Sequence, residues 1–245
     1  MELQSSDELA LTLVGAIRGG YASHVENLLA EHPGLAAALI YDAKGGARTP
    51  LHVVTDWPGY FPNGPEIARI LIAAGADVDS PGVGGGPVAE TPLHWAASSD
   101  DAEVAEVLLD AGANIEAPGG SIAVTPLANA VGYGCWHVAR LLVARGAQIT
   151  DLWQAAALGR TDLVREHLAS VPPPTPEKIT EAFWQACHGG QLRVAALLLA
   201  HGADINGHPH YAEQPALHVV QGPDTRHEAL ATWLREQGAR EAESD

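Results

Sequence analysis

Aromatic residues and long apolar runs are scarce in this sequence of 245 residues. Aromatic side chains make up 5% of the chain, as 6 Trp, 5 Tyr and 2 Phe, whereas hydrophobic residues reach 47%. Most of the apolar content is therefore small and aliphatic, which suits closely packed helices better than a β-sandwich core. Because no run of about 18 apolar residues occurs, we expect no membrane span.

Positive charge and cysteine are also in short supply. Lys and Arg total 13 against 30 Asp and Glu, which gives a formal net charge of −17. Nucleic acids and anionic membrane surfaces attract clustered Lys and Arg, so neither is expected as a partner. The two cysteines cannot form a disulfide framework, and the acidic first residues do not resemble a signal peptide. Together these features predict a cytoplasmic location, and the Ala- and Gly-rich composition suggests a bacterial source.

Two short motifs recur in phase along the chain. The sequence Thr-Pro-Leu begins at Thr49, Thr91 and Thr125, and a related Pro-Ala-Leu-His segment begins at Pro215. A Gly-Ala motif follows each copy and one more lies between the third and fourth copies, so its glycines fall at 75, 112, 146, 202 and 238. Three of the four intervals between these glycines are 37, 34 and 36 residues. The fourth interval, of 56 residues, is long enough to contain one degenerate copy. A repeat of this length indicates a stacked repeat architecture.

The pattern resembles the ankyrin repeat, a unit of about 33 residues with a β-turn, two helices and the signature T-P-L-H-x-A. The resemblance covers nearly the whole chain and is closest at residues 91–115. It implies an all-α ankyrin-repeat solenoid that forms a single domain over residues 1–245, with about seven helix-turn-helix units joined by β-turn fingers. We expect the units at about residues 5–40, 45–80, 87–116, 121–150, 151–175, 176–210 and 211–240, of which the fifth is degenerate.

Local signals add helix boundaries and residue roles. Thr followed by Pro favours the start of a helix. The first unit lacks this motif, and its helices are expected at 7–18 and 22–31. The resemblance implies that the motif histidines His52, His94 and His218 brace adjacent turns by hydrogen bonding. Trp153 and Trp184 align with this histidine in the fifth and sixth units, where we expect them to fill the vacated space.

The second unit departs from the repeat through an insertion at residues 56–65. About five extra residues separate its two helices, and they bring Asp56, Trp57, Tyr60 and Phe61 into a loop rich in Pro and Gly. Exposed aromatic side chains on a stiff loop are typical anchors for a binding partner. The alternative is a loop that folds back and covers the groove of its own chain.

The resemblance also implies that the first helix of each unit lines a concave groove. Beside the insertion, the predicted binding residues are those on the inner wall, Trp95, Asn129, Gln154 and Gln185, and those at helix ends, Ser98, Ser99, Tyr133 and His188. Large rings beside amide groups suit a peptide or a polar small molecule.

These observations predict a binding module rather than an enzyme. The expected partner is a protein or peptide, held by the groove and the fingers and carrying a basic surface that complements the acidic chain. The alternative is a small-molecule-binding or enzymatic ankyrin protein, with the insertion as a lid and Asp56 or His188 as general base. Cys135 and His137 are two residues apart on a predicted helix and so do not face each other. No catalytic residue, metal site or cofactor is predicted.

Overall fold

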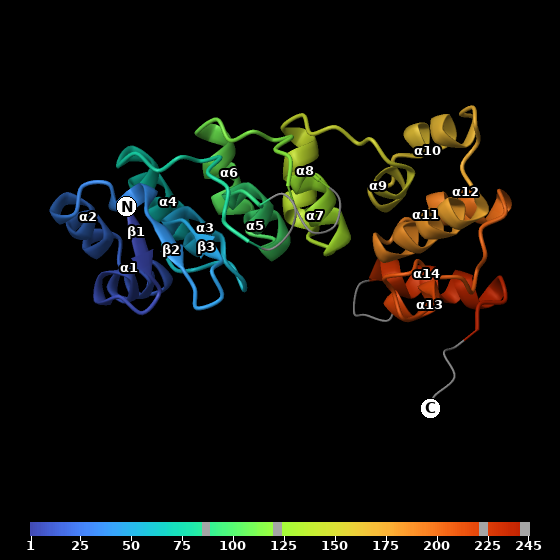
Figure 1. Cartoon of the computed structure of the whole chain (residues 1–245). Helices are drawn as coiled ribbons and strands as arrows, with labels where there is room; N and C mark the ends of the chain where they lie inside the picture. The colour runs from blue at the N-terminus through green and yellow to red at the C-terminus, as the bar shows by residue number, and fades with distance from the viewer. Residues whose placement is uncertain (85–88, 120–123, 221–224, 241–245) are drawn as a thin grey trace. The chain divides into compact units, whose positions relative to one another are not determined.

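The computed structural model describes residues 1–84, 89–119, 124–220 and 225–240 (Figure 1). The chain divides into two compact units, Met1–Gln148 and Ile149–Asp245, which are treated one at a time below. Within the described residues, no helix has the length and apolar character needed to cross a membrane. Helices dominate both units, as the resemblance implies.

The first unit is built from consecutive helix pairs. First helices contact first helices along the chain, α1 with α3, α3 with α5 and α5 with α7, and the second helices α2, α4, α6 and α8 do the same. The result is two layers of short helices that follow one another in chain order (Figure 1). The helices are α1 Glu8–Arg18, α2 Ala22–Glu31, α3 Pro50–Thr55, α4 Gly64–Ala73, α5 Pro92–Ser99, α6 Ala102–Asp110, α7 Pro126–Gly132 and α8 Trp136–Ala144.

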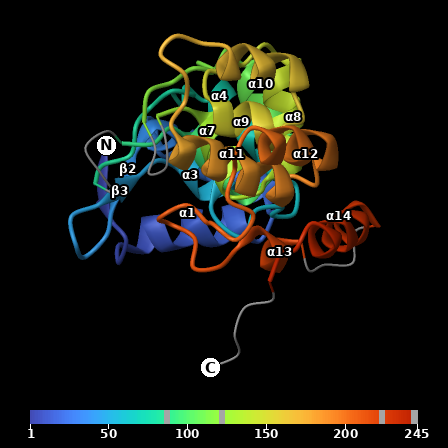
Figure 2. The same cartoon turned by 90° about the vertical axis from the view of Figure 1, so that its right-hand side faces the viewer.

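The second unit is organised around one longer helix. Helix α11 contacts α9, α12 and α13, and α10 contacts α12. Helices α11 and α12 run side by side in both views (Figure 2). Phe183, on α11, is fully buried in the core of this unit. The helices are α9 Leu152–Ala157, α10 Thr161–Leu168, α11 Pro176–His188, α12 Leu192–Ala200, α13 Ala216–Val219 and α14 Thr225–Glu236.

The helix starts confirm the meaning of the Thr-Pro motif. Thr49, Thr91 and Thr125 are each the N-cap residue of a helix whose first residue is proline. Proline suits this position because its fixed φ is helical and its missing N–H has no partner there. The helix predicted at 22–31 is confirmed as α2. The helix predicted at 7–18 begins one residue later, because Asp7 is its N-cap.

A small β-sheet adds to the all-α architecture that the sequence predicted. Strand β1, Glu2–Gln4, pairs in parallel with β2, Leu39–Tyr41, which pairs in antiparallel fashion with β3, Ala47–Arg48. The turn between β2 and β3 is closed by Asp42, whose Oδ1 accepts the backbone N–H groups of Lys44 and Gly46 at 2.7 and 3.1 Å. Strands of two or three residues are too short for their alternation to be detected in the sequence.

Small residues allow the first helices to approach one another, as the composition suggests. Ala96, Ala97, Ala155 and Ala156 are fully buried on α5 and α9. A side chain larger than alanine at these positions would separate the helices, because protein interiors are close-packed. The number of repeat units and the single domain over the whole chain stay predictions.

Candidate functional site

A hollow in the first unit collects several of the predicted binding residues. It has a volume of about 510 Å³ and lies at the C-terminal ends of α3 and α5 and beside Tyr133, the C-cap of α7. We refer to it as the Trp95 hollow. The predicted residues lining it are Asp56, Trp57, Trp95, Ser98, Ser99 and Tyr133, and Thr55 and Glu90 complete the lining.

Aromatic rings form much of this lining. Trp57 and Tyr133 are 78% and 52% exposed. Trp95 is half-buried, and its indole packs edge-on against the imidazole of His52, with 5.0 Å between ring centroids. The hollow therefore combines one ring held by the core with two rings that face solvent.

The carboxylate of Glu90, another residue of the lining, accepts a hydrogen bond from a buried amide. Asn129, which has no exposed surface, donates from Nδ2 to Glu90 Oε1 at 2.9 Å and to Ser98 Oγ at 3.3 Å. Its Oδ1 is buried without a hydrogen-bond partner among the described residues. Asn129 was predicted to face the groove, but it lies beneath the lining and supports it. Glu90 was missed, because the repeat pattern assigns no role to the residue before the Thr-Pro motif.

Asp56 lines the hollow in an ion-paired state. Its Oδ2 lies 2.5 Å from Arg18 Nη2 and 2.9 Å from Arg48 Nη1. Neither arginine is among the residues that line the hollow. The charge of this carboxylate is thus offset within the chain.

The insertion at 56–65 is held on the turns of both adjacent helix pairs. The Tyr60 backbone N–H donates to Asp101 Oδ2 at 2.8 Å, and the Tyr60 hydroxyl donates to the carbonyl oxygen of Asp100. On the other side, Asn63 Nδ2 donates to the carbonyl oxygen of Gly20 at 2.9 Å. Tyr60 and Phe61 line a separate depression beside Asp101, so of the three aromatic residues in the insertion only Trp57 reaches the Trp95 hollow.

The other predicted binding residues belong to the second unit. Gln154 is buried, and its Oε1 accepts the backbone N–H groups of Thr150 and Asp151 at 3.1 and 3.2 Å. It therefore caps the start of α9 instead of facing a groove as predicted. The alignment placed it level with Trp95, but α9 begins one residue later relative to its alanine pair, and Gln154 takes the third helical position, as His94 does in α5.

Gln185 and His188 belong to a side-chain cluster on α11, in which Gln185 is buried, His188 is half-buried and Tyr211 is 51% exposed. Gln185 Nε2 donates to the Tyr211 hydroxyl at 3.0 Å, and that hydroxyl donates to Glu181 Oε1 at 3.2 Å. Burial is the main cause that raises the pKa of Tyr211 above its usual range. Burial likewise lowers the pKa of His188, whose ring lies 5.3 Å from that of Trp184. Both predicted residues serve packing and internal hydrogen bonding in this unit.

Cys135 and His137 do not interact as a nucleophile and a base. His137 Nδ1 lies 2.6 Å from Asp100 Oδ2, while Cys135 Sγ points to the carbonyl oxygen of Ser98 at 3.4 Å. Burial raises the pKa of the Cys135 thiol to about 11, so it is protonated at neutral pH. Among the described residues, no group of three His, Cys, Asp or Glu side chains is placed to hold a metal ion.

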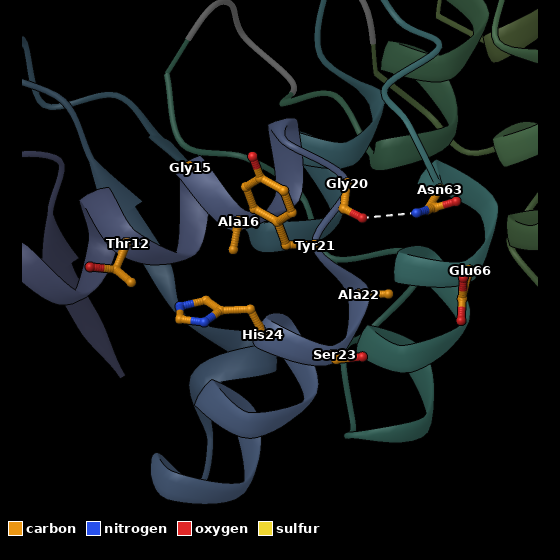
Figure 3. Close-up of a pocket in the computed structure, with 10 residues that line it drawn as sticks. All are labelled: Thr12, Gly15, Ala16, Gly20, Tyr21, Ala22, Ser23, His24, Asn63 and Glu66. Carbon is orange, nitrogen blue, oxygen red and sulfur yellow. Dashed lines mark hydrogen bonds between the residues drawn. The ribbon is translucent and has the colours of Figure 1, made fainter.

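A larger hollow, of about 930 Å³, lies beside the turn between α1 and α2. We refer to it as the Tyr21 hollow. Figure 3 shows Tyr21 and His24 between Thr12 on one side and Asn63 and Glu66 on the other. Small residues such as Gly15 and Ala22 form much of its lining, and none of the predicted binding residues lies there.

Comparison with known proteins agrees with the repeat architecture. A family model described as ankyrin repeats (3 copies) matches residues 60–151. An ankyrin repeat and KH domain-containing protein of Caenorhabditis briggsae is 30% identical over 183 residues, which cover 71% of this chain and 7% of that protein. The chain thus spans a small part of the length of this relative, a nematode protein that lends no support to a bacterial source. The chain belongs to the ankyrin-repeat family.

Proposed function

We propose that this chain binds a protein or peptide partner through the Trp95 hollow. Ankyrin repeats are general protein-interaction modules, and repeat arrays bind through surfaces shared by neighbouring repeats. The observation that carries the proposal is the convergence of six predicted binding residues from three consecutive helix pairs on one hollow. These residues form one surface only when the repeats are stacked. Partner binding would therefore depend on the folded array.

The exposed rings support a role in partner binding. Trp57 and Tyr133 remain 78% and 52% exposed, although burying their rings is favourable. Trp and Tyr are enriched among the residues that carry most of the binding energy at interfaces. A partner side chain inserted between them would remove this apolar surface from water.

The surroundings of the hollow favour an open binding face over an enclosed active site. The insertion is hydrogen-bonded to Gly20 and Asp101 on the adjacent turns, an arrangement that supports a fixed edge rather than a lid. The net charge of −17 favours a partner with a basic surface. The proposal keeps the predicted cytoplasmic location, in keeping with Cys135 and Cys187 as free cysteines.

Selection from a phage-displayed library of short random peptides tests this proposal. Peptides selected on the full chain would be synthesised, and their affinity measured by isothermal titration calorimetry. We expect Trp57→Ala and Tyr133→Ala each to weaken binding by about tenfold or more, because each removes an exposed ring at the centre of the interface. Tyr21→Ala is the matched control, since Tyr21 is 65% exposed in the same unit but lines the Tyr21 hollow.

Three results would contradict the proposal. Selected peptides could bind Trp57→Ala and Tyr133→Ala as tightly as the unmodified chain. Binding could be lost only in Tyr21→Ala, which would move the site to the Tyr21 hollow. The selection could also enrich no peptide that binds the chain in solution.

A further inference from the structure

The Trp95 hollow adjoins a second hollow of the same unit. The second hollow has a volume of about 430 Å³, and Trp95 belongs to its lining as well. An ion pair also joins the two linings, because Arg48 Nη1 of the second hollow lies 2.9 Å from Asp56 Oδ2 of the first. We refer to the second hollow as the Arg48 hollow. Its lining consists of Ser5, Ile40, Asp42, Gly46, Ala47, Arg48, Val83, Gly84 and Trp95.

The Trp95 hollow offers hydrogen-bond donors to a ligand. The indole N–H groups of Trp57 and Trp95 have no hydrogen-bond partner among the described residues, and the Tyr133 hydroxyl is a further donor in this lining. The Ser and Thr hydroxyl protons of the lining are instead donated to backbone carbonyl oxygens of the chain. The donors that a ligand meets here are therefore carried by the aromatic side chains.

The same lining also offers acceptors. Asp56 Oδ2 carries the ion pairs with Arg18 and Arg48, whereas Asp56 Oδ1 has no hydrogen-bond partner among the described residues. Two arginines already offset the charge of this carboxylate, so its second oxygen suits a neutral N–H group better than a further cation. The carboxylate of Glu90, which accepts from Asn129, and the Ser hydroxyl oxygens are the other acceptors.

The Arg48 hollow repeats this combination of donors and acceptors. Its charged residues are one acid, Asp42, and one base, Arg48, so the lining has no formal net charge. Asp42 Oδ2 and the Ser5 hydroxyl have no hydrogen-bond partner in the part of the chain that the structure describes. Val83, which is 42% exposed, adds apolar surface to the same lining.

A ligand for this pair of hollows needs both donors and acceptors and little charge of its own. A peptide backbone has this character when it is extended, because its N–H and C=O groups are then open to a partner. In a helix most of these groups are bonded to one another. We propose that an extended segment of the partner lies across both hollows and passes over Trp95, an inference that rests on the function proposed above. Its backbone bonds to the indole N–H groups and to the Asp56 carboxylate, and its side chains pack against Trp57, Tyr133 and Val83.

The conformation of a bound peptide tests this inference first. Peptides from the library selection described above would be isotope-labelled and bound to the full chain. Nuclear Overhauser effects within the peptide report its bound conformation. We expect strong contacts between the Hα of each residue and the amide proton of the next, without the successive amide–amide contacts of a helix.

A variant of the chain and a variant of the peptide together test recognition of the backbone. Trp95→Phe keeps a ring and removes the N–H, and we expect it to weaken peptide binding about fivefold. Replacing each peptide amide in turn by an ester weakens the carbonyl as an acceptor. At one position the ester should weaken binding to the unmodified chain but have little further effect on binding to Trp95→Phe. Urea unfolding checks that the variant is folded.

The Arg48 hollow is tested by Val83→Ala, which removes apolar surface from its lining. We expect binding about fivefold weaker, and the loss should disappear when residues are removed from one end of the peptide. Sensitivity to Trp57→Ala should remain in the shortened peptide. Leu11→Ala is the matched control, since Leu11 is 59% exposed in the same unit but lines neither hollow.

Three results would each overturn the inference: a helical bound peptide, ester replacements without effect at every amide, or equal affinity for Val83→Ala and the unmodified chain. If the peptides still needed Trp57, partner binding itself would stand and only the extended segment would be refuted. If no selected peptide needed Trp57 or Tyr133, the proposed function would fail and this inference with it.

Discussion

The two units of this protein use different side chains for the hydrogen bond that joins one repeat to the next. In the first unit, His52 Nε2 lies 3.0 Å from the carbonyl oxygen of Glu90, the residue before the next helix cap. In the second unit, Trp184 Nε1 donates at 3.0 Å to the carbonyl oxygen of Gln214, which also directly precedes a helix cap. In both units a ring nitrogen thus reaches the backbone of the next finger, and an indole makes this contact as well as an imidazole.

The other function of the histidine is transferred to a different residue. His52 Nδ1 also accepts the backbone N–H of Thr49 at 3.2 Å, so one ring both caps its own helix and braces the next repeat. These two bonds require a neutral ring with its proton on Nε2. Trp has no second nitrogen, and in the second unit capping is done by Gln154 at the start of α9. The two functions that His52 combines are thus found on two different helices of the second unit, capping at Gln154 of α9 and bracing at Trp184 of α11.

Replacement of Trp184 is expected to have the largest effect on this comparison. Trp184 is 8% exposed, and Trp184→Ala should lower the free energy of unfolding by about 3–5 kcal/mol through loss of packing and of the Nε1–H bond. Trp184→Phe keeps most of the packing and should cost about 1 kcal/mol. Urea unfolding, with hydrogen exchange measured separately for the two units, checks both values. A Phe variant as stable as the unmodified chain would show that the indole acts only by filling space.

The second-largest expected effect concerns the stability of the first unit in acid. Burial is the main cause that lowers the pKa of His52 from 6.5 to about 4. The unfolded chain therefore binds a proton between these values while the folded chain does not, so stability is fully present above pH 6.5 and falls as the pH drops towards 4. The contribution of His52 is on the order of 3 kcal/mol, and the bond of Trp184 has no titrating group.

The matched variant for this measurement is His52→Gln, which retains a capping oxygen like that of Gln154. Urea unfolding of both proteins between pH 7 and pH 4, with exchange measured in residues 1–148, should give a smaller loss in the variant. The loss of stability in acid must be compared between His52→Gln and the unmodified chain, because burial also lowers the pKa of His94 and His188. Parallel curves would show that His52 does not resist protonation.

The smallest expected effect concerns the cap of α9. Gln154→Ala removes the oxygen that accepts from Thr150 and Asp151, and it should lower the free energy of unfolding by about 1 kcal/mol. Gln154→His restores the side chain found in α5 and should recover part of the loss. Exchange at the N-terminal amides of α9 is the direct measurement, and unchanged exchange in Gln154→Ala would contradict the capping role.

The candidate site was predicted in part because local signals are strong in a repeat. A sequence motif that recurs in phase identifies the helix starts, and any residue that departs from the motif stands out against it. Trp57, Trp95 and Tyr133 were found in this way, and they line one hollow. Tyr60 and Phe61 stood out equally, yet they line a separate depression beside Asp101, although Tyr60 is 58% exposed.

By itself, the sequence determined the ankyrin family, the Thr-Pro helix starts and the small residues between stacked helices, since each of these depends on neighbours within a few positions. The tertiary structure alone decided that Asn129 holds Glu90 and that Trp184 braces Gln214. These contacts join residues 30 to 39 positions apart. Their geometry depends on how one repeat stacks on the next, which no short stretch of sequence specifies.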